Sequence, residues 1–134
     1  MNVNHDMEFK TFKIETKDLS GGKATRFLAR TDILKAMIQV VSPNGGENNL
    51  HKHPMDDAVW IVLEGRAKFY GEGDAVIGDL GKYDGLFIPR GMPYWFENPG
   101  SEQLLILRAA GIDKQQGPSV RVAIEPDKNN RSHF

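Results

Sequence analysis

Residues 45–65 read GGENNLHKHPMDDAVWIVLEG, and this stretch decides the fold. The run from Ala58 to Leu63 is rich in β-branched and aromatic residues and stops just before Gly65, so it predicts a β-strand closed by a turn. Upstream of it, His51 and His53 alternate with a lysine. Residues two apart on a strand point to the same face, and we therefore expect the two imidazoles to lie side by side.

Short apolar segments separated by Gly, Pro, Asn and Asp continue on both sides of this stretch. They predict further strands at residues 11–16, 24–29, 34–41, 67–70, 75–77, 86–88, 93–97, 104–108 and 120–124. The chain shows no sustained helical period, and its prolines interrupt any long helix. This pattern favours an all-β sandwich or barrel over alternating βαβ units. We expect one domain, with the barrel at 8–126 and flexible segments at 1–7 and 127–134.

The overall composition excludes several classes of function. The formal net charge is −1, which gives no electrostatic argument for nucleic acid or for an anionic membrane as a partner. The chain has no cysteine, which rules out disulfides and thiolate metal sites. No apolar run is long enough to cross a bilayer, and the polar start does not suit a signal peptide. We expect a cytoplasmic protein without nucleic-acid or membrane partners.

A second informative stretch reads PRGMPYWFEN at residues 89–98. With residues 45–65 it resembles the two motifs of the cupin superfamily, G-x5-H-x-H-x3,4-E-x6-G and G-x5-P-x-G-x2-H-x3-N. The matching residues are Gly45, His51, His53, Gly65, Pro89, Gly91 and Asn98. The resemblance implies a single-domain double-stranded β-helix, a jelly-roll-like barrel. For proteins of this size it also implies a homodimer.

The departures from these motifs concern the metal site that the resemblance implies. In cupins the two motif histidines, the Glu and the second-motif His commonly hold a metal. Counting back from Gly65, the Glu position is occupied by Ala58, and the second-motif His position is occupied by Tyr94. A shorter spacing would place Asp57 at the acidic position, with a local bulge. Tyr83 stands where the second motif opens with Gly. Half of the usual ligands are therefore absent.

Three interpretations of the site stay open. In the first, His51 and His53 hold a divalent metal (Fe, Zn, Mn or Ni), with Asp57 or Tyr94 as a third ligand and open coordination positions for substrate. In the second there is no metal, and the histidines and Tyr94 bind a small organic molecule by hydrogen bonds or act as acid–base groups. In the third the pocket is vestigial, and the domain works through its surface.

Strand alternation also predicts which side chains line the inside of the barrel. The residues expected at the ligand pocket are Gln39, Trp60, Val62, Phe96 and the rim residue Arg90. Their mostly apolar and aromatic character is typical of a small-molecule pocket and suggests an apolar or aromatic ligand. The alternative is that the aromatic side chains simply fill the core of a small barrel.

The leading function from sequence is therefore a small-molecule site in the barrel. If it is catalytic, the residues expected to act are His51, His53 and Tyr94. Oxygenase, isomerase and cyclase chemistries all occur on the fold that the resemblance implies, so the fold does not choose among them. The rival function is a non-catalytic ligand sensor or accessory protein. We expect a homodimer whose exposed strand edges, near residues 12–14 or 120–124, pair with the second copy.

Overall fold

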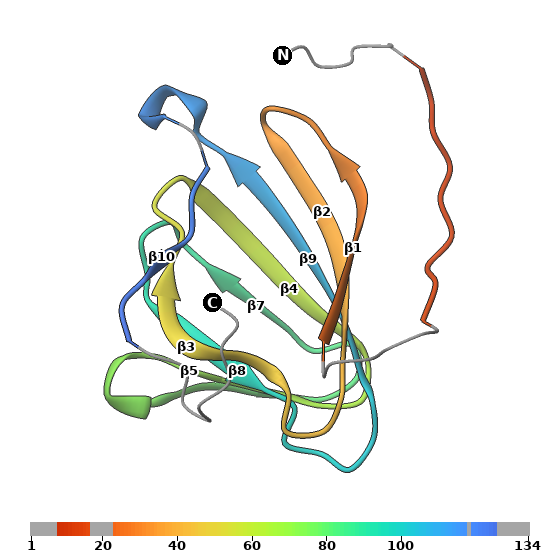
Figure 1. Ribbon diagram of the computed structural model, residues 1–134, viewed down its shortest axis with the longest axis vertical. Helices are drawn as coiled ribbons and strands as arrows, with labels where there is room; N and C mark the ends of the chain where they lie inside the picture. Colours follow the sequence, from red (N-terminus) through yellow and green to blue (C-terminus); the bar gives the residue numbers. More distant parts are fainter. Residues whose placement is uncertain (1–7, 17–22, 118, 126–134) are drawn as a thin grey trace.

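The computed structural model describes residues 8–16, 23–117 and 119–125. Two five-stranded antiparallel sheets face each other across one core (Figure 1). Sheet A has the strand order β1-β2-β9-β4-β7, and sheet B has the order β10-β3-β8-β5-β6. The all-β prediction is confirmed. The predicted flexible segments at 1–7 and 127–134 lie outside the described residues. Within the described part of the chain, no helix is long and apolar enough to cross a membrane.

The strands follow the apolar segments of the sequence closely. In chain order they are β1 Lys23–Arg30, β2 Leu34–Val41, β3 Gly46–Lys52, β4 Asp56–Glu64, β5 Ala67–Tyr70, β6 Val76–Leu80, β7 Gly85–Ile88, β8 Tyr94–Glu97, β9 Leu104–Ile112 and β10 Val122–Ala123. Two single 3₁₀ turns, η1 Glu72–Asp74 and η2 Lys114–Gln116, complete the elements. The strand predicted at 120–124 is reduced to the two residues of β10, which pair with β3.

The prediction of a strand at residues 11–16 is wrong. Residues 8–16 form an extended arm, drawn in red in Figure 1, with no strand assigned along it. Ile14 packs against apolar side chains of sheet A, whereas Phe12 is 60% exposed. Apolar alternation predicts an extended chain, but a strand also needs a neighbour to share its backbone hydrogen bonds. Alternation along one segment carries no information about that neighbour.

Two motif residues have clear structural roles. Gly65 ends β4 with φ +85°, and a Cβ there would lie 2.6 Å from the backbone oxygen of Gln103, so only glycine fits this turn. The Asn98 side-chain amide donates to the backbone oxygens of Val41 and Glu102, at 3.0 and 2.7 Å. These contacts tie the end of β8 to the end of β2 and to the loop before β9.

The core lies between the two sheets and is closely packed. Its largest fully buried side chains include Trp60, Phe69, Tyr94, Phe96, Leu104 and Ile106. The rings of Phe69 and Phe96 stack with centroids 4.9 Å apart, and Trp60 packs against both of them. The prediction that Trp60, Val62 and Phe96 point inward is confirmed. All three have no exposed surface and pack in the core, and the depression at the barrel mouth is lined by other residues.

Candidate functional site in the barrel

The two motif histidines and Tyr94 lie together on the inner side of sheet B. His51 is paired with Tyr94 across β3 and β8, and their ring centroids are 4.4 Å apart. The centroids of His51 and His53 are 5.2 Å apart, with the rings nearly perpendicular. His53 follows the last residue of β3 and so sits at the mouth of the barrel. The sequence prediction that the imidazoles are neighbours is confirmed.

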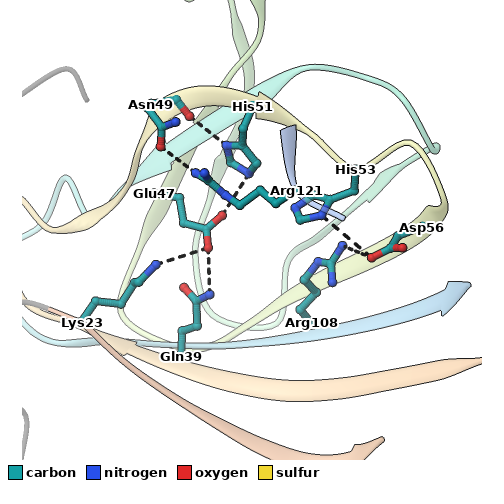
Figure 2. A network of polar contacts seen from close by, with 9 residues as sticks. All are labelled: Lys23, Gln39, Glu47, Asn49, His51, His53, Asp56, Arg108 and Arg121. Carbon is teal, nitrogen blue, oxygen red and sulfur yellow. Dashed lines mark hydrogen bonds and ion pairs between the residues drawn. The ribbon is translucent and has the colours of Figure 1, made fainter. Parts of the chain in front are cut away.

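Each ring nitrogen of His51 has a defined neighbour (Figure 2). Nδ1 lies 2.8 Å from the backbone oxygen of Asn49, and Nε2 lies 3.1 Å from Oε1 of Glu47. A carbonyl oxygen only accepts hydrogen bonds, so Nδ1 carries a proton. The ring of His51 therefore lies between a backbone carbonyl on one side and the carboxylate of Glu47 on the other.

Glu47 is a site residue that the sequence reasoning missed. Its Oε2 accepts from Gln39 Nε2 at 3.1 Å and pairs with Lys23 Nζ at 3.3 Å. Burial alone would raise the pKa of Glu47, but the contacts with His51, Lys23 and Gln39 hold it well below its usual value. Glu47 is therefore a charged carboxylate. The inward direction predicted for Gln39 is confirmed, and its partner is this carboxylate.

His53 faces a different carboxylate. Its Nδ1 lies 3.9 Å from Oδ2 of Asp56, which also pairs with Arg108 at 3.3 Å (Figure 2). Burial, together with the nearby positive charge of Arg108, lowers the pKa of His53 to about 3. His53 is thus a neutral imidazole near pH 7. Ser119 donates to the second oxygen of Asp56 at 2.8 Å and completes the surroundings of this buried acid.

Asp57, predicted as a tentative metal ligand, and Arg90, predicted as a pocket residue, are not among the residues that line the depression at the barrel mouth. Successive residues of a strand point to opposite faces, so the side chain of Asp57 points out of the barrel and that of Asp56 points into it. Its carboxylate pairs with the guanidinium of Arg90 at 2.9 Å, and both side chains are largely exposed. The sequence contains two adjacent aspartates. Which of them lies near the histidines depends on which face of β4 each side chain occupies.

A shallow depression without an enclosed cavity lies at the mouth of the barrel. It is lined by His53, Asp56, Ala58, Ile88, Pro89, Met92, Tyr94 and Arg108. Arg108 comes from β9, is 3% exposed, and holds its guanidinium 5.8 Å from the centre of the Trp60 ring. No sequence pattern pointed to Arg108, because an arginine inside an apolar strand is normally expected on the outer face.

Several buried polar atoms inside the barrel lack a hydrogen-bond partner among the described residues. Apart from Glu47 Oε1 and His51 Nε2, which face each other at 3.1 Å, they are Gln39 Oε1, Asn49 Nδ2, Trp60 Nε1, Tyr94 Oη and Arg108 Nε. Buried polar groups in folded proteins are nearly always paired, with protein, water or ligand, because an unpaired one costs about 1–3 kcal/mol. These atoms belong to inward-facing residues around the histidines.

The donor set does not fit the metal site that the family resemblance implies. Ala58 supplies no ligand atom, and burial raises the pKa of Tyr94 above its ordinary value, which keeps the phenol neutral. Each histidine is instead directed at its own carboxylate, Glu47 or Asp56. In the part of the chain that the structure describes, no three His, Cys, Asp or Glu side chains are grouped to hold a metal ion.

The buried neutral state of His53 predicts a pH dependence of stability. Its pKa falls from 6.5 to about 3 on folding, so between these values the unfolded chain binds more protons. The stabilisation is complete above about pH 6.5 and is lost as the pH falls through this window, by about 2 kcal/mol from pH 6.5 to pH 5. Urea unfolding at both pH values should show this loss, and His53→Asn should lack it. An equal loss in the variant would contradict the prediction.

Comparison with known proteins places the chain among proteins of this architecture. The family model described as "Cupin domain" matches residues 37–109. An uncharacterised protein of Methanocaldococcus jannaschii is 30% identical over 96 residues, which cover 69% of this chain and 73% of that protein. These two matches concern the stretch that carries both histidines and the surrounding strands.

Solved structures agree in fold. A Klebsiella pneumoniae protein with a double-stranded β-helix domain superposes with a TM-score of 0.69 at 17% identity, over 82% of this chain and 90% of that one. KdgF from Halomonas sp. gives 0.62 at 16% identity, over 77% and 92%. An oxalate oxidase in complex with glycolate gives 0.60 at 19% identity, over 75% and 54%. At these identities the likeness concerns the fold.

Proposed function

The chain belongs to the cupin family, and from that premise we propose that it binds a small organic anion, of the carboxylate class, at the mouth of its barrel. The observation that carries this proposal is the set of buried polar atoms without a partner around the histidines and Arg108. Of these residues, Tyr94 and Arg108 line the depression; Arg108 Nε is a donor only, and Tyr94 Oη can donate. An ionised carboxylate is an acceptor only and complements such a set.

The charges around the interior support an anion. The polar network drawn in Figure 2 contains three permanent cations, Lys23, Arg108 and Arg121, against the two carboxylates of Glu47 and Asp56. Three positive charges and two negative charges leave an excess of one positive charge before the histidines are considered. A bound anion would neutralise this excess and pair with Arg108, the buried cation that lines the depression.

The rest of the depression is apolar and suits the carbon skeleton of an organic acid. Ala58, Ile88, Pro89 and Met92 form this part of the lining. We therefore propose an acid with a small apolar body in place of the apolar or aromatic compound that the sequence suggested. One protein of the same fold, the oxalate oxidase, was solved with the carboxylate glycolate, which supports the choice of first probes.

Binding is better supported than turnover. A general base works best with a pKa near the working pH, and burial holds the pKa of His53 at about 3. The imidazole of His53 is then a hydrogen-bonding group more than a proton acceptor. We therefore propose that the protein is a ligand-binding cupin. Metal-dependent binding is one of the outcomes that the test below distinguishes.

The test is a thermal-shift assay with matched pairs of ligands, glycolate against glycolamide and benzoate against benzamide. At least one acid should raise the melting temperature while its neutral amide does not, and the shift should survive treatment with EDTA. The proposal is overturned if the acids raise the melting temperature only when a divalent metal is added. It is also overturned if no acid in a wider panel of carboxylates raises the melting temperature.

Tyr94→Phe tests the same site without changing its shape. Removing the unpartnered buried hydroxyl should leave the free protein as stable as the wild type or slightly more so. Binding of the responsive acid should weaken by roughly tenfold, about 1.4 kcal/mol, as measured by calorimetric titration. The matched control is Tyr70→Phe, since Tyr70 donates to Glu97 at 2.6 Å on the outer side of sheet B. Equal affinities of both variants would remove Tyr94 from the site.

A further inference from the structure

Lys35 is a lysine on the inner face of sheet A. Further along the same strand Met37 packs against the core and Gln39 is buried inside the barrel, and alternation along β2 places Lys35 on the face that they share. Its Nζ donates to Ser119 Oγ at 2.7 Å, and Ser119 donates in turn to Asp56. Asp56 lines the depression at the barrel mouth, so the ammonium group of Lys35 is directed toward that depression.

The strand register places Lys35 beside the depression. Lys35 pairs with Ala110 across β2 and β9, and Ala110 pairs with Ala58 across β9 and β4. Ala58 lines the depression, and the two short alanine side chains separate Lys35 from it only slightly. Arg108, which also lines the depression, is the diagonal neighbour of Lys35 on this face, at a Cα separation of roughly 7–8 Å. Two cationic side chains therefore flank the same end of the barrel interior.

The charges that act on Lys35 are mostly positive. Burial is the main cause that lowers its pKa, the carboxylate of Asp56 opposes this shift, and the guanidinium groups of Arg108 and Arg30 add to it. Asp56 is shared, because it also pairs with Arg108 at 3.3 Å. Three cations are thus set against one carboxylate. A further negative charge at this place would favour the charged form of the lysine.

Both cations that flank the depression have donors to offer. A lysine ammonium has three N–H donors, and among the described residues Ser119 accepts one of those of Lys35. The Nε of Arg108 is buried without a partner in the described part of the chain. The barrel mouth therefore contains two separate cationic groups that can each receive an acid group.

We propose, on the basis of the proposed function, that the ligand is a dicarboxylate whose acid groups are joined by a short carbon chain, one held by Arg108 and the other by Lys35. The two cations reach different oxygens of Asp56, Arg108 directly and Lys35 through Ser119. A single carboxylate would have to displace this Asp56–Ser119 unit in order to pair with both cations. Two carboxylates separated by a spacer can pair with one cation each.

The test is calorimetric titration of the full chain with diacids and their half-amides, succinate against succinamate and glutarate against glutaramate, at neutral pH and equal ionic strength. Each half-amide keeps the carbon skeleton of its diacid and has one charge fewer. The wild type should bind at least one diacid about tenfold more tightly than its half-amide, because the diacid makes a second charge-assisted contact.

Variants of Lys35 assign this preference to its charge. Lys35→Gln should bind the half-amide as the wild type does and lose the preference for the diacid, whereas Lys35→Arg should keep it. Lys82→Gln is the matched control, since Lys82 lies in the exposed turn between β6 and β7, and it should behave like the wild type. Binding of the half-amide shows that a variant is folded. If Lys35→Gln does not fold, the comparison of diacid and half-amide in the wild type still decides.

The possible failures of this inference and of the proposed function are distinct. A wild type that binds diacid and half-amide equally well overturns the dicarboxylate inference and leaves the proposed function standing, because one carboxylate is then sufficient. A diacid preference that survives in Lys35→Gln also overturns it, because the second acid group then pairs elsewhere. If neither monocarboxylates nor dicarboxylates bind, both proposals are wrong.

Discussion

Replacing Arg108 by alanine is expected to lower the free energy of unfolding by about 3–5 kcal/mol. The Arg108 side chain is 4% exposed, and its partner Asp56 has no exposed side-chain surface. Removing the guanidinium leaves a carboxylate in the interior with its main positive partner gone, and desolvation of an unpaired charge is strongly unfavourable. Urea unfolding at pH 7 measures the loss, which should be among the largest of any single polar substitution in this chain.

Two further variants separate the buried pair from a general effect of losing an arginine. Arg66→Ala removes an arginine whose ion pair with Asp79 is half exposed on both sides, and its effect should stay below about 1 kcal/mol. Adding Asp56→Asn to Arg108→Ala should restore part of the lost stability, because it neutralises the stranded acid. If Arg108→Ala and Arg66→Ala behave alike, the buried pair does not hold the site together as we describe.

Replacing Phe96 by alanine is expected to destabilise the protein by about 3–5 kcal/mol. Phe96 has no exposed surface and packs on Phe69 and Trp60 with ring centroids 4.9 and 5.2 Å away. The deletion removes a whole ring from a close-packed core and leaves a cavity that its neighbours fill only in part. Thermal or urea unfolding measures the effect directly.

Phe27→Ala is the matched control for this change. Phe27 lies on the edge strand β1 and is 47% exposed, so the same deletion should cost far less than at Phe96. The comparison also distinguishes two interpretations of the barrel interior. If Phe96 lined an open ligand cavity, its removal would enlarge that cavity at little expense of stability and would mainly alter binding. A loss at Phe96 no larger than at Phe27 would support that interpretation.

The two motif histidines of this cupin barrel each face a different carboxylate. His51 is directed at Glu47 on its own strand, and His53 is directed at Asp56 at the start of β4. The two imidazoles are therefore in different electrostatic settings although they are neighbours. Arg108 balances Asp56 and is the cation closest to the depression. An anionic guest completes this set of charges more simply than a cation does.

The amino-acid sequence by itself determined the fold class and the placement of the histidine pair. Period-two alternation in 58–63 and 94–96 identified the inward side chains correctly, because the pleat of a strand fixes side-chain direction locally. The spacing of Gly45, His51 and His53, with Gly65 after them, identified the family, and Gly65 occupies a turn that only glycine fits.

The tertiary structure alone decided which charged groups surround the histidines and whether the inward aromatic side chains pack or line a cavity. Glu47 reaches His51 because the pairing of β3 with β8 shifts register between them, and Arg108 reaches Asp56 from a strand 52 positions later in the chain. The side chain of Asp56 points into the barrel and that of Asp57 points out of it, because the register of β4 against β9 fixes the face on which each residue lies. Periodicity gives the direction of a side chain, but the distance to the opposite sheet, and therefore the space left inside, arises only when the two sheets pack together.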